Sequence, residues 1–204
     1  MLLSTLFTDP IAVLAFASAL VIGISVHEFA HAFVADKLGD PTARHQGRVT
    51  LNPLAHLDPL GSVMLFIAGF GWGRPVPVNP RNFERPALDE LLVALAGPVS
   101  NFLTAAVLGL LYQLTGGLSE VWSVLLLLVI QINLFLMVFN LIPIPPLDGS
   151  KLFRVFLGEA AFRALEALSL PLIIGLLILL RSTPLGETLS SLVETLTRVL
   201  ITTL

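Results

Sequence analysis

Three long apolar stretches constrain the fold of this chain more than any other feature. They cover about residues 10–36, 88–114 and 121–142, and each has roughly 20 residues or more. A helix needs about this length to cross a hydrocarbon core about 30 Å thick. In lipid, every backbone group must be hydrogen-bonded within the protein, and a helix achieves this within one segment. The sequence therefore predicts an all-α polytopic membrane protein built as a helical bundle.

Weaker apolar segments leave the number of membrane-spanning helices between about four and six. Residues 168–180 are apolar but short for a span unless their helix begins further upstream. Residues 60–71 are too few for a straight crossing, so we expect a short tilted span or a re-entrant segment. The tail, residues 185–204, has apolar residues at helical spacing that charged residues interrupt. An amphipathic helix at the membrane interface is the favoured interpretation, and a further span is the alternative.

Composition agrees with a membrane protein and argues against several other classes. Charged residues make up 12% of the 204 residues, whereas an ordinary soluble domain has about 25%. The net charge is −3 and the chain has no dense basic run, which argues against binding of nucleic acid. The sequence contains no cysteine, so disulfides, thiol nucleophiles and cysteine-based metal sites are excluded.

The basic residues predict how the helices are oriented across the membrane. The first ten residues contain no Lys or Arg and no clear cleavage site follows, so the first span is interpreted as a retained helix. If residues 60–71 do not cross, most of the basic residues lie on one side of the membrane. These are Lys37, Arg44, Arg48, Arg74, Arg81, Arg85, Lys151, Arg154 and Arg163. The positive-inside rule assigns that side to the cytoplasm, and the charge bias in turn favours a segment that does not cross.

A cluster of ionisable residues lies near the end of the first span, in His27-Glu28-Phe29-Ala30-His31. Residues four apart lie on one face of a helix, so His27 and His31 can both bind one metal ion. Glu28 is close enough to hold a metal-bound water, as in the HExxH zinc motif, where the glutamate is the general base. The alternative is that these five residues match the motif by chance. The free energy of membrane insertion argues against chance, because each ionisable side chain deep in a spanning helix costs about 2.5–3.5 kcal/mol on insertion scales.

A catalytic zinc site usually has three protein ligands and a water, so a third acidic or histidine ligand is required. Asp148 is the candidate, and it follows three prolines that end the third span while the sequence is still apolar. Pro-Pro-Leu-Asp-Gly is by itself more typical of a turn than of a metal ligand. Non-helical backbone at membrane depth, however, persists only inside the protein or along a water-filled cavity. In the predicted orientation, Asp148 also approaches the site from the same side as His27.

HEFAH lies in a first span, and FNLIPIPPLDG follows a later one. Together, these two motifs resemble those of the site-2 protease family of intramembrane zinc metalloproteases, peptidase family M50. The segments NPLAHLDPLG (52–61), PVPVNPRNF (75–83) and GPVSN (97–101) are similar to a compact bacterial branch without PDZ-like or CBS-type domains. The likeness covers roughly residues 20–155.

The resemblance implies a reaction and assigns roles to individual residues. One zinc ion per chain is held by His27, His31 and Asp148, and Glu28 activates the water that attacks a peptide bond. Asn140, which precedes the LDG motif, helps to bind the substrate or its oxyanion, with a helix-end hydrogen bond as the alternative. The implied activity is hydrolysis within transmembrane segments, as in regulated intramembrane proteolysis.

Other polar residues carry smaller predictions. Asn101, in the second span, is expected to have a satisfied amide beside a helix kink, with a contact to the substrate as the alternative. His45 and His56 are expected near the surface and away from the metal. By resemblance, residues 69–79 form a membrane-associated β-hairpin or edge strand that pairs with an unfolded substrate.

The resemblance also implies a single integral-membrane metalloprotease domain over residues 1–204. Its catalytic core covers about 10–155, and C-terminal helices cover about 160–204. The implied partners are a membrane-spanning protein substrate and the lipid bilayer of the bacterial inner membrane, with the active site toward the cytoplasm. The sequence makes no prediction of the oligomeric state.

Two other classes of protein are alternatives to a protease. A non-catalytic zinc-binding scaffold or adaptor is the first, and Glu28 argues against it because a structural metal site needs no general base. A zinc transporter is the second. It would normally have further carboxylates or histidines along a path through the membrane, and the predicted spans offer few.

Overall fold

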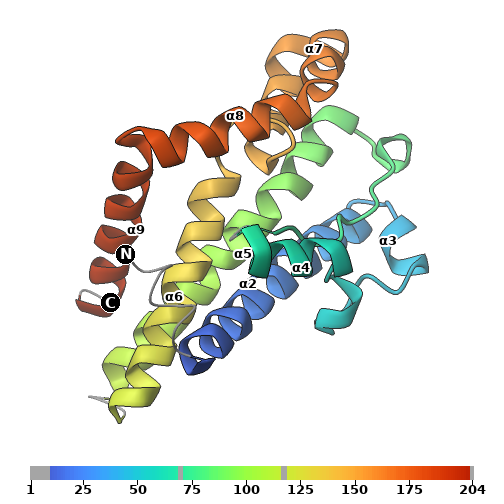
Figure 1. The fold of residues 1–204 in the computed structure, drawn as a ribbon. Coiled ribbons are helices and arrows are strands. Elements are labelled where there is room, and N and C mark those ends of the chain that lie inside the picture. The colour runs from blue at the N-terminus through green and yellow to red at the C-terminus, as the bar shows by residue number, and fades with distance from the viewer. Residues whose placement is uncertain (1–9, 69–70, 116–118, 203–204) are drawn as a thin grey trace.

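The computed structural model describes residues 10–68, 71–115 and 119–202, and most of these residues are helical (Figure 1). The α-helices are α2 (Pro10–Lys37), α3 (Thr42–His45), α4 (Pro59–Ala68), α5 (Pro86–Leu114), α6 (Glu120–Asn140), α7 (Lys151–Glu166), α8 (Ser169–Ser182) and α9 (Leu185–Thr202). Short 3-10 helices lie between them at η1 (Pro53–Ala55), η2 (Pro80–Asn82) and η3 (Asp148–Ser150). The predicted all-α polytopic fold is confirmed.

Three helices are long and apolar enough to cross a membrane, and they match the three predicted spans. α2, α5 and α6 contain 28, 29 and 21 residues. A fourth span results if residues 148–166 and α8 are counted together, although the two parts bend by 85° at their junction. α4 has 10 residues and is therefore only about 15 Å long, half of the hydrocarbon core. The described helices thus give three spans, or four with the bent pair, which is at or below the lower end of the predicted four to six.

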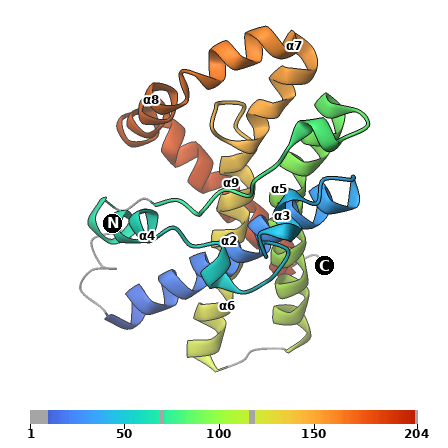
Figure 2. The same cartoon turned by 90° about the vertical axis from the view of Figure 1, so that its right-hand side faces the viewer.

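The three long helices pack against one another, and α5 also contacts α7, α9, η2 and η3 (Figures 1 and 2). Small residues allow this close approach, as they do between membrane helices in general. A Cβ at Gly23 of α2 would lie 2.7 Å from Leu136 Cδ1 of α6, so only glycine fits there without a shift. α5 is thus the element through which the parts of the bundle are connected.

The C-terminal helix α9 packs along α6 and α5 (Figure 1). Its buried residues Val193 and Leu200 join a core cluster with residues of the two long helices. Gln113 Nε2 of α5 donates a hydrogen bond of 2.8 Å to the carbonyl oxygen of Leu200. The charged residues of α9 are exposed on other faces. The predicted amphipathic helix is confirmed, and its depth in the bilayer stays a prediction.

The predicted β-hairpin is not formed within the described residues. Residues 72–79 run as extended chain and pair only through an isolated antiparallel bridge between Leu57 and Gly73. Prolines at 75, 77 and 80 have no backbone N–H to donate, which explains why this pairing does not continue as a ladder. Residues 69–70 of the expected hairpin lie outside the described ranges.

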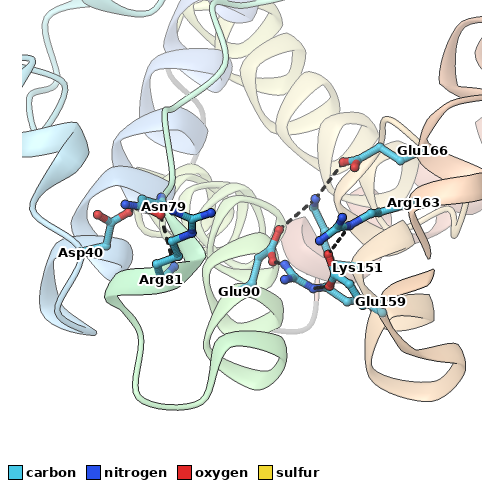
Figure 3. Close-up of polar contacts among 9 residues, drawn as sticks. Asp40, Asn79, Arg81, Glu90, Lys151, Glu159, Arg163 and Glu166 are labelled. Carbon is cyan, nitrogen blue, oxygen red and sulfur yellow. Dashed lines mark hydrogen bonds and ion pairs between the residues drawn. The ribbon is translucent and has the colours of Figure 1, made fainter. Parts of the chain in front are cut away.

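Asp40 connects the loop after α2 to the segment before α5 (Figure 3). Its buried carboxylate accepts hydrogen bonds from Thr42, from the backbone N–H of Asn79 at 2.7 Å and from Asn82 Nδ2 at 2.7 Å. Burial acts to raise the pKa of Asp40, but these hydrogen bonds outweigh it and hold the pKa below its ordinary value. The loops on this side of the bundle are therefore joined by one ionised carboxylate.

Candidate metal centre and active site

One face of α2 brings two histidines together, and a turn after α6 brings an aspartate to them. The rings of His27 and His31 lie 4.5 Å apart between centroids. Their Nε2 atoms are 3.0 and 3.4 Å from the same atom, Asp148 Oδ2. One ligand atom from each of the three residues lies within 4.8 Å of the others. The structure therefore brings together the three residues that the sequence predicts as metal ligands.

Asp148 reaches this position because the chain after α6 turns tightly. α6 ends at Asn140, and the proline-rich segment that follows leads into η3, whose first residue is Asp148. A Cβ at Gly149 would lie 2.3 Å from the carbonyl oxygen of Leu141, so the turn packs against the end of α6 only with glycine. Asp148 therefore lies in a turn, and this turn is compatible with a role as a metal ligand, which stays a prediction.

The other ring nitrogen of each histidine is held by a hydrogen-bond acceptor. His27 Nδ1 lies 2.6 Å from Asn101 Oδ1, and His31 Nδ1 lies 2.7 Å from the carbonyl oxygen of Val93. We assign the imidazole hydrogens to Nδ1 from these partners. In the neutral rings, the Nε2 lone pairs then face Asp148. Such outer partners are what orients histidine ligands in metal sites.

The donor set and the space around it fit a zinc ion. Asp148 Oδ2 is buried and has no hydrogen-bond partner, so three lone pairs converge where a cation would neutralise them. Ligand atoms about 2.0–2.1 Å from a tetrahedral ion lie roughly 3.4 Å apart, close to the two distances observed here. Two imidazoles and a carboxylate, with a position left for water, are typical of catalytic zinc. Within the described ranges, no other three His, Cys, Asp or Glu residues have ligand atoms that all lie within 4.8 Å of one another.

Gly97 of α5 lies directly against the two histidines. A Cβ at this position would be 2.5 Å from His31 Nε2 and 2.6 Å from His27 Nε2. Any larger side chain would therefore fill the space where the ligand nitrogens converge. Sequence reasoning assigned this glycine no role in the site, although its spacing of four residues from Asn101 was an available signal.

Glu28 is half-buried and is not part of the ligand group. A Cβ on Gly73 would lie 3.6 Å from Glu28 Oε1, which places the carboxylate beside the extended segment 72–79. Arg48 donates hydrogen bonds to the carbonyl oxygens of Arg74 and Pro75, at 2.5 and 3.0 Å, and so holds this segment. Burial lowers the pKa of Arg48, and the nearby Glu28 carboxylate opposes this effect. The Glu28 carboxylate, one residue after His27 in α2, thus lies next to the extended segment that Arg48 holds.

The predicted substrate contacts have partners within the protein. Asn101 is fully buried, and its Nδ2 donates to the Gly23 carbonyl oxygen at 3.0 Å and to Asn133 Oδ1 at 2.9 Å. Its amide is therefore satisfied, as the first of its two interpretations expected. Asn140 Nδ2 donates to the Leu136 carbonyl oxygen at 3.0 Å, which is the expected helix-end hydrogen bond. Contact of either asparagine with a substrate stays a prediction.

The remaining histidines lie outside the ligand group. His45 is exposed, as expected. The expectation that His56 lies near the surface is wrong, since this residue is 0% exposed and its Nε2 lies 2.6 Å from the Thr50 carbonyl oxygen. The loop folds back over His56 because the N–H of Arg74 donates to the His56 carbonyl oxygen at 2.7 Å. This contact between distant loop segments has no local sequence pattern.

The fold and the site define an integral membrane protein with a His/His/Asp group inside its helical bundle that could hold a metal ion. Comparison with known proteins identifies its family. The model of peptidase family M50 matches residues 15–181, so this chain belongs to peptidase family M50. No solved structure matches the chain.

Curated relatives of the chain carry names of the same kind. "Putative zinc metalloprotease YwhC" of Bacillus subtilis is 45% identical over 147 residues, which cover 66% of this chain and 65% of the relative. "Putative zinc metalloprotease Rip2" of Mycolicibacterium smegmatis is 36% identical over 152 residues, or 71% of this chain and 58% of the relative. Rip2 of Mycobacterium tuberculosis is 34% identical, with the same two shares. The chain thus matches less than two thirds of each relative's length.

Proposed function

We propose that this protein is an intramembrane zinc metalloprotease that hydrolyses peptide bonds in the transmembrane segments of other proteins. The observation that carries the proposal is the convergence of His27, His31 and Asp148 inside an apolar bundle, with Glu28 beside them. Membership of peptidase family M50 supports the same class of reaction. In this proposal the catalytic core is about residues 10–155 of a single domain.

The chain's own residues divide the catalytic work. His27, His31 and Asp148 hold the zinc, and Asn101 and the Val93 carbonyl keep the histidines oriented. Zinc, when bound, polarises the scissile carbonyl and lowers the pKa of a water toward about 7. Glu28 takes the proton of the attacking water and delivers it to the leaving amine. Such positioned proton transfer contributes about 10²–10⁴-fold to a rate.

A substrate helix has to unwind before it can react, since its peptide carbonyls are otherwise hydrogen-bonded within the helix. The extended segment 72–79 lies next to Glu28 and is placed to receive an unwound chain. Asn140, at the end of α6, contacts this chain or its oxyanion in our proposal. We propose that the site faces the cytoplasm of a bacterial inner membrane, and the nine basic residues expected on one side, if residues 60–71 do not cross, support this orientation.

Cleavage of a model single-span protein by detergent-purified enzyme tests the proposal, with zinc content measured on the same samples. Wild type should cleave and carry roughly one zinc per chain, while Glu28→Gln should keep its zinc and lose cleavage by about 100-fold or more. A Glu28→Gln enzyme with normal proteolysis would exclude this mechanism. Zinc in both proteins with cleavage in neither, across a panel of substrates, would indicate a zinc-binding scaffold instead.

A further inference from the structure

We propose that Glu90 of α5, together with Lys151 and Arg154 of α7, forms an ionic clamp that positions Asp148 for metal binding. We refer to these three residues as the α5–α7 clamp. Glu90 and Lys151 are labelled in Figure 3. The inference rests on the proposed function, because it concerns how the third ligand of that metal centre is held. Glu90 is a positioning residue in this proposal, since it acts through the Asp148 turn.

The clamp lies where η3 passes into α7. Lys151 and Arg154 follow Asp148 by three and six residues. Lys151 Nζ lies 3.0 Å from Glu90 Oε1, and Arg154 makes an ion pair with Glu90 Oε2. Lys151 Nζ also lies 4.7 Å from the ring centroid of Phe162, a buried residue of α7. One carboxylate on α5 therefore binds both cations of the first turn of α7.

The same helix face carries the contacts to the histidines. Glu90, Val93, Gly97 and Asn101 follow one another at spacings of three and four residues along α5. Val93 binds His31, Gly97 lies against both rings, and Asn101 binds His27. A contact at Glu90 therefore fixes the start of α7 relative to the histidine half of the site. Glu90 and Val93 are only about 4.5 Å apart along the helix axis.

α7 has few other ways to be held in place. It contacts the rest of the described chain mainly through α5 and η3. Residues 156–161 of α7 are exposed, and Gly158 has a φ of +79°, which interrupts the helix. The second fixed point of the turn is Gly149, which packs against the end of α6. The clamp is thus the polar connection between Asp148 and the helix that orients the histidines.

The surrounding charges allow the clamp to be tested without unfolding the protein. Arg154 Nε lies 2.7 Å from Glu159 and Lys151 Nζ lies 3.4 Å from Glu166, whose side chains are 45% and 53% exposed. Glu90 is only 11% exposed. After Glu90→Gln, both cations keep these outer partners, so neither becomes an uncompensated buried charge. Glu159→Gln is the matched control, because it removes an exposed partner of Arg154 without touching α5.

The test measures how tightly full-length protein in detergent retains zinc, using a chelator to follow dissociation. Glu90→Gln should release zinc roughly 10- to 100-fold faster than wild type, the range typical for loss of an outer partner of a metal site. Glu159→Gln should release it as wild type does. The cobalt(II)-substituted protein should show an altered visible spectrum in Glu90→Gln alone, which a loss of stability without a shift of Asp148 would not produce. The thermal midpoint of the metal-free protein should fall only slightly, because Lys151 and Arg154 keep their outer partners.

Two results would overturn the clamp. Equal zinc release from Glu90→Gln and wild type would do so, and so would equal acceleration by Glu90→Gln and Glu159→Gln. A wild-type protein that binds no zinc would instead contradict the proposed function, so the two failures are distinguishable.

A covalent replacement of the ion pair gives a second test. The chain has no cysteine, so a Glu90→Cys, Arg154→Cys double variant can be joined by a bifunctional, disulfide-forming thiol reagent without background. The cross-linked protein should recover slow zinc release, and reduction of the link should reverse this recovery. Release that is equally fast before and after cross-linking would show that the α5–α7 distance does not position Asp148.

Discussion

The two halves of the proposed metal centre are built in different ways. His27 and His31 lie in one long helix, their side chains are 9% and 10% exposed, and each has its second ring nitrogen bound to α5. Asp148 lies in a short turn, its side chain is 20% exposed, and its buried oxygen Oδ2 has no hydrogen-bond partner. The histidine half is therefore fixed by secondary structure, whereas the aspartate half relies on how the turn and α7 pack.

This difference shows where the site is preformed and where it is adjustable. Ligands on helices are placed more accurately than ligands on loops, because backbone hydrogen bonds fix the helix. Two histidines on α2 alone give a bidentate site, and the third ligand completes it only when the chain after α6 returns to α2. Changes on the two sides of the centre should consequently have effects of different size and kind.

The largest effect is expected from removal of a ligand. His27→Ala, His31→Ala and Asp148→Ala should each lose both bound zinc and cleavage, because two remaining ligands do not make a catalytic zinc site. Zinc content of purified protein and cleavage of a single-span substrate measure this. The comparison of the two halves is sharpened by Asp148→Glu, which should retain some zinc because its turn can shift. Complete loss there would show that the aspartate half is as rigid as the histidine half.

A steric block should be nearly as severe. Gly97→Ala places a Cβ about 2.5 Å from the ligand nitrogens, so zinc binding and cleavage should be lost while the metal-free protein stays folded. Alanine is about 1 kcal/mol better than glycine inside a helix, which offsets part of the roughly 1–3 kcal/mol cost of overpacking, so the thermal midpoint of that protein should fall only slightly. Gly175→Ala in α8 is the control, since a Cβ there has no neighbour within 4 Å. Normal zinc content in Gly97→Ala would contradict the observed approach of α5 to the histidines.

Local patterns in the sequence were enough for the histidine half of the site. A spacing of four residues on one helix places His27 and His31 together, and three long apolar stretches predict three spanning helices. Asp148 was a candidate from its place after three prolines at the end of an apolar span, but only resemblance to known motifs assigned it as a ligand, because its 3-10 turn brings together segments about 120 residues apart. Its approach depends on tertiary packing that no local period encodes.

Contacts between distant segments were the part that sequence reasoning missed. The Val93 carbonyl binds His31, but a carbonyl is the same in every residue type and leaves no trace in the sequence. The partners of Glu90 lie about 60 residues away on α7. The hairpin prediction was wrong within the described residues, since alternate positions in 72–79 looked strand-like but two of them are prolines without a donor.

A moderate effect is expected from the asparagines that orient His27. Asn101→Leu should weaken zinc binding by roughly 10- to 100-fold, because His27 loses the acceptor for its Nδ1 hydrogen. Asn133→Leu should have a smaller effect, since Asn133 acts only through Asn101. Competition with a chelator measures both affinities.

Asn140→Leu provides the matched comparison for these two variants. Its amide contacts Leu136 and none of the metal ligands, so its zinc affinity should equal that of wild type while cleavage falls if it contacts the substrate. Equal loss of zinc affinity in Asn101→Leu and Asn140→Leu would show that the His27 contact is not what matters.

The smallest effect concerns the loops beside the histidine half. Because the folded-state pKa of Asp40 is lowered, its contribution to stability is present above the ordinary pKa and is lost as pH falls through the folded value. Acid should therefore release the Asp40 contacts to Asn79 and Asn82, and limited proteolysis within residues 38–83 should increase at low pH. Asp40→Asn should show this increase in proteolysis already at neutral pH, because the neutral side chain loses about 1–2 kcal/mol of hydrogen bonding.

Since Asp40 lies beyond the end of α2, the histidines should stay in place and zinc content at neutral pH should be unchanged. Loss of zinc from Asp40→Asn would show instead that the histidine half depends on its loops as the aspartate half depends on α7.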